Sequence, residues 1–129
     1  MNYYFSKTLD KDFDTVIGDV TEALKQEGFG ILTEIDVAAT LKKKIDVDFR
    51  KYRILGACNP PYAYKALIAE DKIGTMLPCN IIVQQLENGQ VEVAAIDPMA
   101  SMVSVNNPAL GEIATEIQAK LKKVIDTLR

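Results

Sequence analysis

The sequence has no histidine and no tryptophan, and it has only two cysteines, Cys58 and Cys79. The absence of histidine excludes Ser-His-Asp and Cys-His catalysis as well as histidine metal sites. Two cysteines allow at most one disulfide bond, which a chain of 129 residues does not need for stability. We therefore expect two free thiols in a reducing, cytoplasmic setting.

Basic residues are also fewer than acidic residues. The chain carries 15 Lys and Arg against 18 Asp and Glu, with a net charge of −3 and a pI of about 5.0. An acidic chain has no broad positive field to attract phosphate backbones, so we expect no nucleic-acid partner. Apolar runs extend over a few residues, far below the roughly 20 that span a bilayer, and the first residues do not have the pattern of a signal peptide. We expect a soluble protein that is neither exported nor membrane-bound.

Length and composition indicate one globular domain over residues 1–129. Hydrophobic residues make up 48% and charged residues 26%, which are the proportions of folded domains. Turn and cap residues divide the chain into a strand, helix, strand, short helix, strand, helix, hairpin and helix. This order favours an α+β fold in which a mainly antiparallel sheet has helices packed on one face.

Apolar periodicity and capping residues place the helices. Side chains at three- and four-residue spacing predict a helix from Phe13 that ends at Gly28. A short helix is expected at Val37–Ile45, another from Pro60 to about Asp71, and a long amphipathic helix from Pro108. The expected strands cover residues 2–9, 29–35, 52–58, 79–87 and 90–97.

The last two strands are expected to form a hairpin. The Asn88-Gly89 pair predicts a two-residue type I′ turn, which would place Asn80 opposite Asp97 and Cys79 opposite Pro98. One face of the hairpin would then carry Ile82, Leu86, Val91, Val93 and Ala95, with Asn80 and Asp97 at its end. The other face would carry Ile81, Val83, Ala94 and Ile96. That second apolar face predicts a homodimer, because an apolar surface of this kind is rarely left uncovered.

The two cysteines occupy different local settings. Cys58 precedes Asn59, which we expect to cap the helix that begins at Pro60, and a sulfur near that helix end would favour the thiolate. The alternative is that Cys58 is a small buried hydrophobe. Cys79 begins a strand and should point away from Asn80. Metal binding by Cys58, Cys79, Glu70 and Asp97 has no Cys-x-x-Cys spacing to support it, so we expect no metal and no cofactor.

Several short blocks together resemble a known family. The blocks are Gly28-Phe29-Gly30, Leu32-Thr33-Glu34-Ile35-Asp36, Leu55-Gly56-Ala57-Cys58-Asn59-Pro60, Ile73-Gly74, Leu77-Pro78-Cys79-Asn80 and Asp97-Pro98. In this order they are similar to the bacterial and archaeal family called domain of unknown function 302. The resemblance implies a curved, TATA-binding-protein-like sheet and a dimer, and it implies no established activity. The family's most distinctive residues match the Cys58-Asn59-Pro60 and Pro78-Cys79-Asn80 blocks together with Glu70 and Asp97.

The sequence is compatible with three functions. The first is binding of a small molecule in a pocket where the candidate residues converge between helices and sheet. Those residues are Cys58, Asn59, Glu70, Cys79, Asn80 and Asp97. The second is a thiol-dependent redox enzyme or sensor that uses Cys58, with Cys79 as the resolving thiol. The third is a homodimeric interaction module without chemistry. Whether the two thiols lie in one concave site separates these alternatives.

Overall fold

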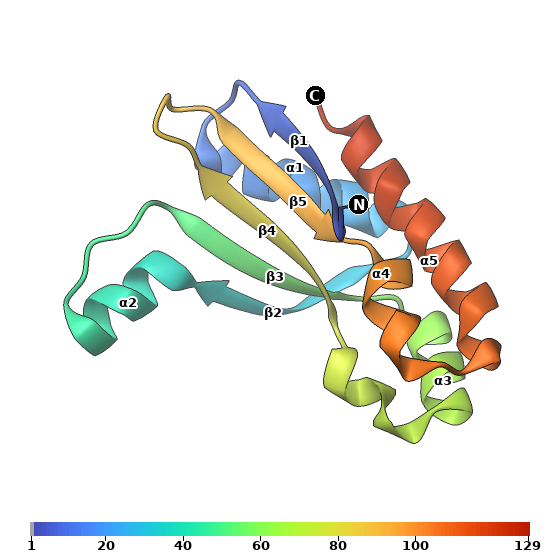
Figure 1. The fold of residues 1–129 in the computed structure, drawn as a ribbon. Helices are drawn as coiled ribbons and strands as arrows, with labels where there is room; N and C mark the ends of the chain where they lie inside the picture. The colour runs from blue at the N-terminus through green and yellow to red at the C-terminus, as the bar shows by residue number, and fades with distance from the viewer. Residues whose placement is uncertain (1) are drawn as a thin grey trace.

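The computed structural model describes residues 2–129 and shows an α+β fold built on one five-stranded sheet (Figure 1). The order across the sheet is β1-β5-β4-β3-β2, and each neighbouring pair is antiparallel. This confirms the predicted sheet. The strands are β1 (Tyr4–Leu9), β2 (Gly30–Asp36), β3 (Tyr52–Cys58), β4 (Cys79–Gln85) and β5 (Val91–Ile96).

Helices connect β1 to β2, β2 to β3 and β3 to β4, and further helices follow β5 (Figure 1). They are α1 (Phe13–Gln26), α2 (Val37–Ile45), α3 (Pro60–Ala69), α4 (Pro98–Met102) and α5 (Pro108–Thr127), with the 3₁₀ helices η1 (Asp71–Met76) and η2 (Val103–Val105). The sequence predicted four of them. It did not predict α4, η1 or η2, because segments of three to six residues are too short to show a helical period. Within residues 2–129 no helix has both the length and the apolar character needed to cross a bilayer.

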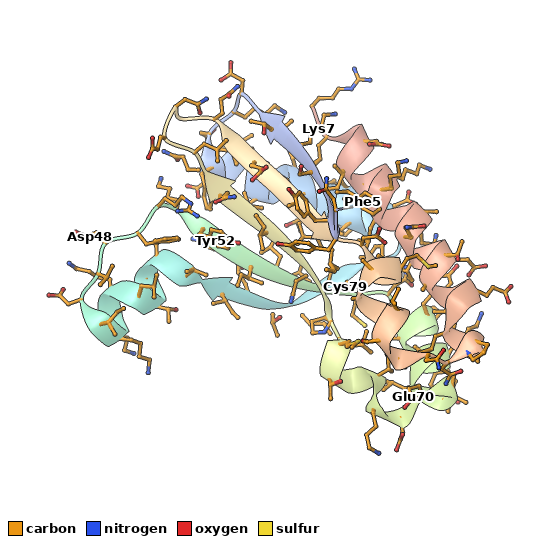
Figure 2. The ribbon with its side chains drawn as sticks, in the orientation of Figure 1. Phe5, Lys7, Asp48, Tyr52, Glu70 and Cys79 are labelled. Carbon is orange, nitrogen blue, oxygen red and sulfur yellow. The ribbon has the colours of Figure 1, made fainter. Side chains whose placement is uncertain are left out.

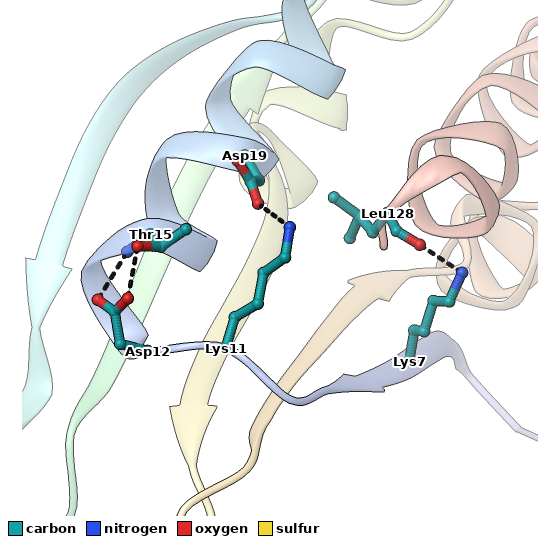
Figure 3. Close-up of polar contacts among 6 residues, drawn as sticks. All are labelled: Lys7, Lys11, Asp12, Thr15, Asp19 and Leu128. Atoms are coloured by element: carbon teal, nitrogen blue, oxygen red, sulfur yellow. Dashed lines mark hydrogen bonds and ion pairs between the residues drawn. The ribbon is translucent and has the colours of Figure 1, made fainter.

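Local hydrogen bonds cap the start of α1 and join the residue after α5 to β1 (Figure 3). The carboxylate of Asp12 accepts hydrogen bonds from the backbone N–H and the hydroxyl of Thr15, which caps α1. After the helix, Gly28 adopts a φ of 86°, the left-handed conformation that glycine tolerates best. At the other end of the chain, the Lys7 ammonium donates to the backbone oxygen of Leu128 and joins β1 to the residue after α5.

The core lies between one face of the sheet and the helices α1 and α5. Both helices place their apolar stripes on this face, and the strands contribute alternate residues to it. Its central members include Val16, Val20, Leu24, Leu55, Ile81, Val83, Val91, Val93, Ala95, Leu121, Val124 and Ile125. The opposite face of β4 and β5 carries no packed helix, and Ile82, Ala94 and Ile96 are half-buried there.

The turn between β4 and β5 has three residues rather than the two that the sequence predicted. The Leu86 N–H donates to the Gln90 oxygen at 2.8 Å, and the Gly89 N–H donates to the Leu86 oxygen at 3.0 Å. Gly89 has a φ of 88°, whereas Asn88 does not enter the left-handed region that a type I′ turn requires. The predicted turn type was therefore wrong, because Asn88 satisfies its side chain within the loop through the N–H of Gln90.

The extra loop residue shifts the register of the hairpin by one. Ile81 pairs with Ala95 and Gln85 with Val91, so the predicted pairs of Asn80 with Asp97 and of Cys79 with Pro98 do not form. A shift of one residue moves each side chain of one strand to the other face. As a result Ile81 and Val83 lie under the helices, and their predicted place on the second apolar face was wrong. Ile82 lies on the open face instead.

Gly56 in β3 lies beneath two side chains. A Cβ atom at this position would be 2.1 Å from the Thr33 Oγ1 and 2.7 Å from the Pro78 Cγ. The β2 register shifts between Ile31 and Thr33, which leaves Leu32 as an unpaired, exposed residue. The bulge in β2 and the segment before β4 thus meet over Gly56, where β3 has no side chain.

Replacing Gly56 with alanine is expected to destabilise the protein by roughly 1–3 kcal/mol, because Thr33 and Pro78 must move to admit the methyl group. Gly30→Ala is the matched control, since a Cβ at Gly30 meets no atom within 4 Å. Urea unfolding of the two variants measures the difference. Equal stabilities for Gly56→Ala and Gly30→Ala would contradict the crowding at Gly56.

Candidate functional site

A pocket of about 220 Å³ opens where β3 ends and β4 begins, between these strand ends and the helices α3 and α5. Its walls are predominantly apolar, and they come from five separate parts of the chain. The lining residues are Phe29, Leu32, Ala57, Cys58, Asn59, Tyr62, Ala63, Ala66, Leu77, Pro78, Cys79, Met102, Ile113, Ala114 and Ile117. Apolar walls with a few polar groups are typical of small-molecule sites.

Both thiols line this pocket. Cys58 is the last residue of β3 and Cys79 the first residue of β4, and Cys79 pairs with Ala57, the neighbour of Cys58. The antiparallel pairing therefore brings together two cysteines that are 21 positions apart. Both are free and half-buried. The two thiols thus occupy one concave site, which is the condition that separates the functions left open by the sequence.

The Cys79 thiol is held in its protonated form. Burial is the larger cause and the negative charge of a Cys58 thiolate the smaller one, and together they raise the pKa of Cys79 from 9.0 to about 11. Cys79 lines the pocket while Asn80 is exposed, which agrees with the predicted alternation of these two side chains. An uncharged thiol matches the apolar walls around it.

Asn59 stands at the beginning of α3, but its side chain does not cap the helix as predicted. Pro60 and Pro61 have no N–H groups, and the Tyr62 N–H is already bonded to the Asn59 backbone oxygen at 3.1 Å. The Asn59 side chain is therefore free to donate its Nδ2 to the Glu27 oxygen at 3.1 Å. This bond joins the turn after α1 to the start of α3 and orients Asn59 in the pocket wall.

Glu70 lies away from the thiols. It follows the last residue of α3, and its carboxylate accepts from the Asn107 Nδ2 at 3.2 Å. The same Nδ2 lies 3.0 Å from the Ala69 oxygen, so Asn107 connects the end of α3 to the beginning of α5. Figure 2 shows Glu70 well separated from Cys79. Glu70 therefore stabilises a helix junction and does not line the pocket.

Asn80 and Asp97 are also outside the pocket and do not face each other. Asn80 is exposed on the open face of the sheet, opposite Gly56. Asp97 caps α4 by accepting from the Met99 N–H at 3.0 Å and also accepts from the Gln118 Nε2 at 3.0 Å. The expected convergence of six residues thus holds for Cys58, Asn59 and Cys79 alone. Among residues 2–129 no three His, Cys, Asp or Glu side chains cluster in a way that could hold a metal ion.

The sequence did not predict that helices contribute to the pocket, and Met102 and Tyr62 are two of the helical residues that it missed. Met102 belongs to α4, which has no helical signal, and Tyr62 is one of two tyrosines in α3, with no pattern that distinguishes it. Hydrogen bonding to Glu116 is the largest cause that raises the pKa of Tyr62. The ammonium groups of Lys65 and Lys120 lie 5.6 and 5.9 Å from the centre of the Tyr62 ring. Tyr62 therefore lies between the apolar wall of the pocket and the charged side chains of Lys65, Glu116 and Lys120.

Comparison with known proteins identifies a family and a fold. The model of the family described as "Domain of unknown function DUF302" matches residues 5–128. An uncharacterized conserved DUF302 protein from Bacillus stearothermophilus, known from a crystal structure, has 33% sequence identity and a TM-score of 0.92, and all of both chains is covered. No curated protein matches the chain. These similarities do not indicate an activity.

The raised pKa of Cys79 predicts a loss of stability in alkali. The unfolded chain releases this proton near pH 9 and the folded chain near pH 11, so the stabilisation is present below pH 9 and is lost as the pH rises to 11. Two pKa units correspond to roughly 2–3 kcal/mol. Urea unfolding from pH 8 to 11 should show this loss in the wild type and in Cys58→Ala, and Cys79→Ala should lack it. Identical pH profiles for all three proteins would contradict the assignment.

Proposed function

The chain belongs to the DUF302 family, and we propose that it binds a small, mostly apolar molecule in the pocket formed by Cys58, Asn59, Cys79 and the surrounding walls. One observation carries the proposal, namely an apolar pocket of about 220 Å³ between helices and sheet that also holds an amide and two thiols. Folded domains seldom leave a pocket of this composition unless a ligand uses it. The bulge in β2 lies beside it and contributes Leu32 to its wall.

The size and polar groups of the pocket indicate the kind of ligand. An apolar cavity of roughly 150 Å³ accepts benzene, so this pocket suits a somewhat larger ring system. The Asn59 Nδ2 is already bonded to Glu27, but its Oδ1 makes no hydrogen bond within residues 2–129. Every fully buried side-chain polar atom in these residues has a partner, so Oδ1 reaches accessible space. A ligand with one N–H or O–H donor would bond to it.

Binding is favoured over thiol catalysis by the make-up of the walls. Of the described residues that line the pocket, none has a carboxylate or an amine that would act as a general base for Cys58. A thiol-dependent redox enzyme or sensor is thus the weaker alternative. Both thiols are free, which suits the reducing cytoplasm that we propose as the location of the protein.

Indole is the probe that tests the proposed ligand class, because it combines an apolar ring system with one N–H donor. We expect saturable chemical-shift changes at pocket residues in NMR titrations, and weaker binding of naphthalene, which has no donor. Ala63→Leu, which fills the pocket, should weaken indole binding by about tenfold or more, which corresponds to about 1.4 kcal/mol. Ala119→Leu, an exposed position on α5, is the matched control and should bind indole as the wild type does.

Two results would refute the proposed ligand class. The first is an absence of saturable shifts at the pocket in the wild type. The second is unchanged indole affinity in Ala63→Leu when thermal unfolding shows that the variant is folded.

We also propose a homodimer that forms through the open face of the sheet. The predicted interface is revised, since Ile81 and Val83 are buried in the core. In the observed register Ile54 pairs with Ile82 and Ile82 with Ala94, so an apolar row crosses three strands. Isologous contact with a second copy is the simplest cover for this row.

Light scattering at micromolar concentration is expected to give twice the chain mass of 14.3 kDa. Ile82→Arg should shift the protein toward the monomer, because it places a charge in the proposed interface. Ile68→Arg introduces the same charge at an exposed position of α3 and should remain dimeric. A monomeric wild type, or equal effects of the two substitutions, would refute the open-face dimer.

A further inference from the structure

Three sulfur-bearing side chains from three separate elements line the same pocket. Cys58 ends β3, Cys79 begins β4 and Met102 ends α4. Cys79 pairs with Ala57, the residue next to Cys58, so the two cysteines are neighbours across the β3–β4 pair. The pairing of β3 with β4 and the short helix after β5 thus bring together donors that are far apart in the chain.

The chemistry of these donors favours soft metal ions. Thiolates and thioethers are soft ligands that favour Cu(I), whereas Mg²⁺ and Ca²⁺ need oxygen ligands. Carboxylate and imidazole groups are absent from the described lining of the pocket, so sulfur provides the strongest donors there. A set of three sulfur donors that includes a thioether suits Cu(I), because structural Zn²⁺ sites, which also use thiolates, take four protein ligands.

We propose that Cys58, Cys79 and Met102 form a binding site for one Cu(I) ion. Binding releases the protons of the two thiols to the solvent, and two thiolates with one Cu(I) leave a single negative charge at the site. The N-terminal end of α3, a helix of ten residues, begins two positions after Cys58 and favours that charge. This site uses the pocket of the proposed function but does not depend on an apolar ligand.

Competition with a coloured Cu(I) chelator, bicinchoninate, tests the site in the full chain under anaerobic, reducing conditions. We expect one Cu(I) per chain in the wild type and no binding in the double variant Cys58→Ser, Cys79→Ser. Met102→Leu should weaken Cu(I) binding by roughly tenfold or more, since loss of even an outer-shell partner costs roughly 10–100-fold. The matched control is Met99→Leu, because Met99 belongs to the same helix and does not line the pocket. It should bind as the wild type does.

X-ray absorption at the copper edge provides a readout that does not depend on the variants. Only sulfur neighbours are expected around the bound ion. Nitrogen or oxygen neighbours, Cu(I) binding that survives in the double cysteine variant, or equal affinities of Met102→Leu and Met99→Leu would overturn the three-sulfur site. A wild type that takes no Cu(I) from the chelator but still binds indole overturns this inference and leaves the proposed function intact. The reverse pattern overturns the proposed function alone.

Discussion

The register between β4 and β5 decides which face of the sheet each side chain of this hairpin occupies, and the core, the open face and the pocket depend on it. Gly89 adopts the left-handed conformation that closes a three-residue loop, and Ile81 is thereby paired with Ala95. If the pairing of β4 with β5 were shifted by one residue, Ile81 and Val83 would leave the core, because neighbouring residues of a strand point to opposite faces. The same alternation directs Cys79 into the pocket and leaves Asn80 exposed on the open face.

The pocket exists because its walls are attached to one another by contacts outside it. Thr33 and Pro78 close over Gly56, which brings the bulged part of β2 and the start of β4 against β3. On the other side, Asn59 bonds to the Glu27 oxygen and fixes the start of α3 beside the turn that follows α1. These contacts hold Cys58 and Cys79 at one place even though no covalent bond joins them.

Polar residues near the pocket satisfy helix ends, and this explains why fewer of them are available to a ligand than their number suggests. Asn107 donates to the Ala69 oxygen at the end of α3 and to the Glu70 carboxylate, and Asp97 accepts from the backbone at the start of α4. Unpaired N–H groups at helix starts require acceptors, and nearby carboxylates and amides supply them. The groups that remain free to contact a ligand are an apolar surface, the Asn59 amide oxygen and the sulfur atoms of the pocket.

The sequence by itself determined the antiparallel α+β architecture, the bounds of α2 and β3, and the pocket segments around Cys58 and Cys79. Apolar periodicity, proline at helix starts and glycine at helix ends are local signals, so they can be read without knowing the fold. Tertiary structure decided the register of the hairpin, the position of α4 with Met102, and which polar residues reach the pocket. Asn88-Gly89 is compatible with either loop length, and burial of Ile81 and Val83 selects between them only once α1 and α5 cover the sheet. Likewise Asn59 is a residue type that commonly caps helices, and the backbone oxygen of Glu27, 32 positions away, determines where its amide points.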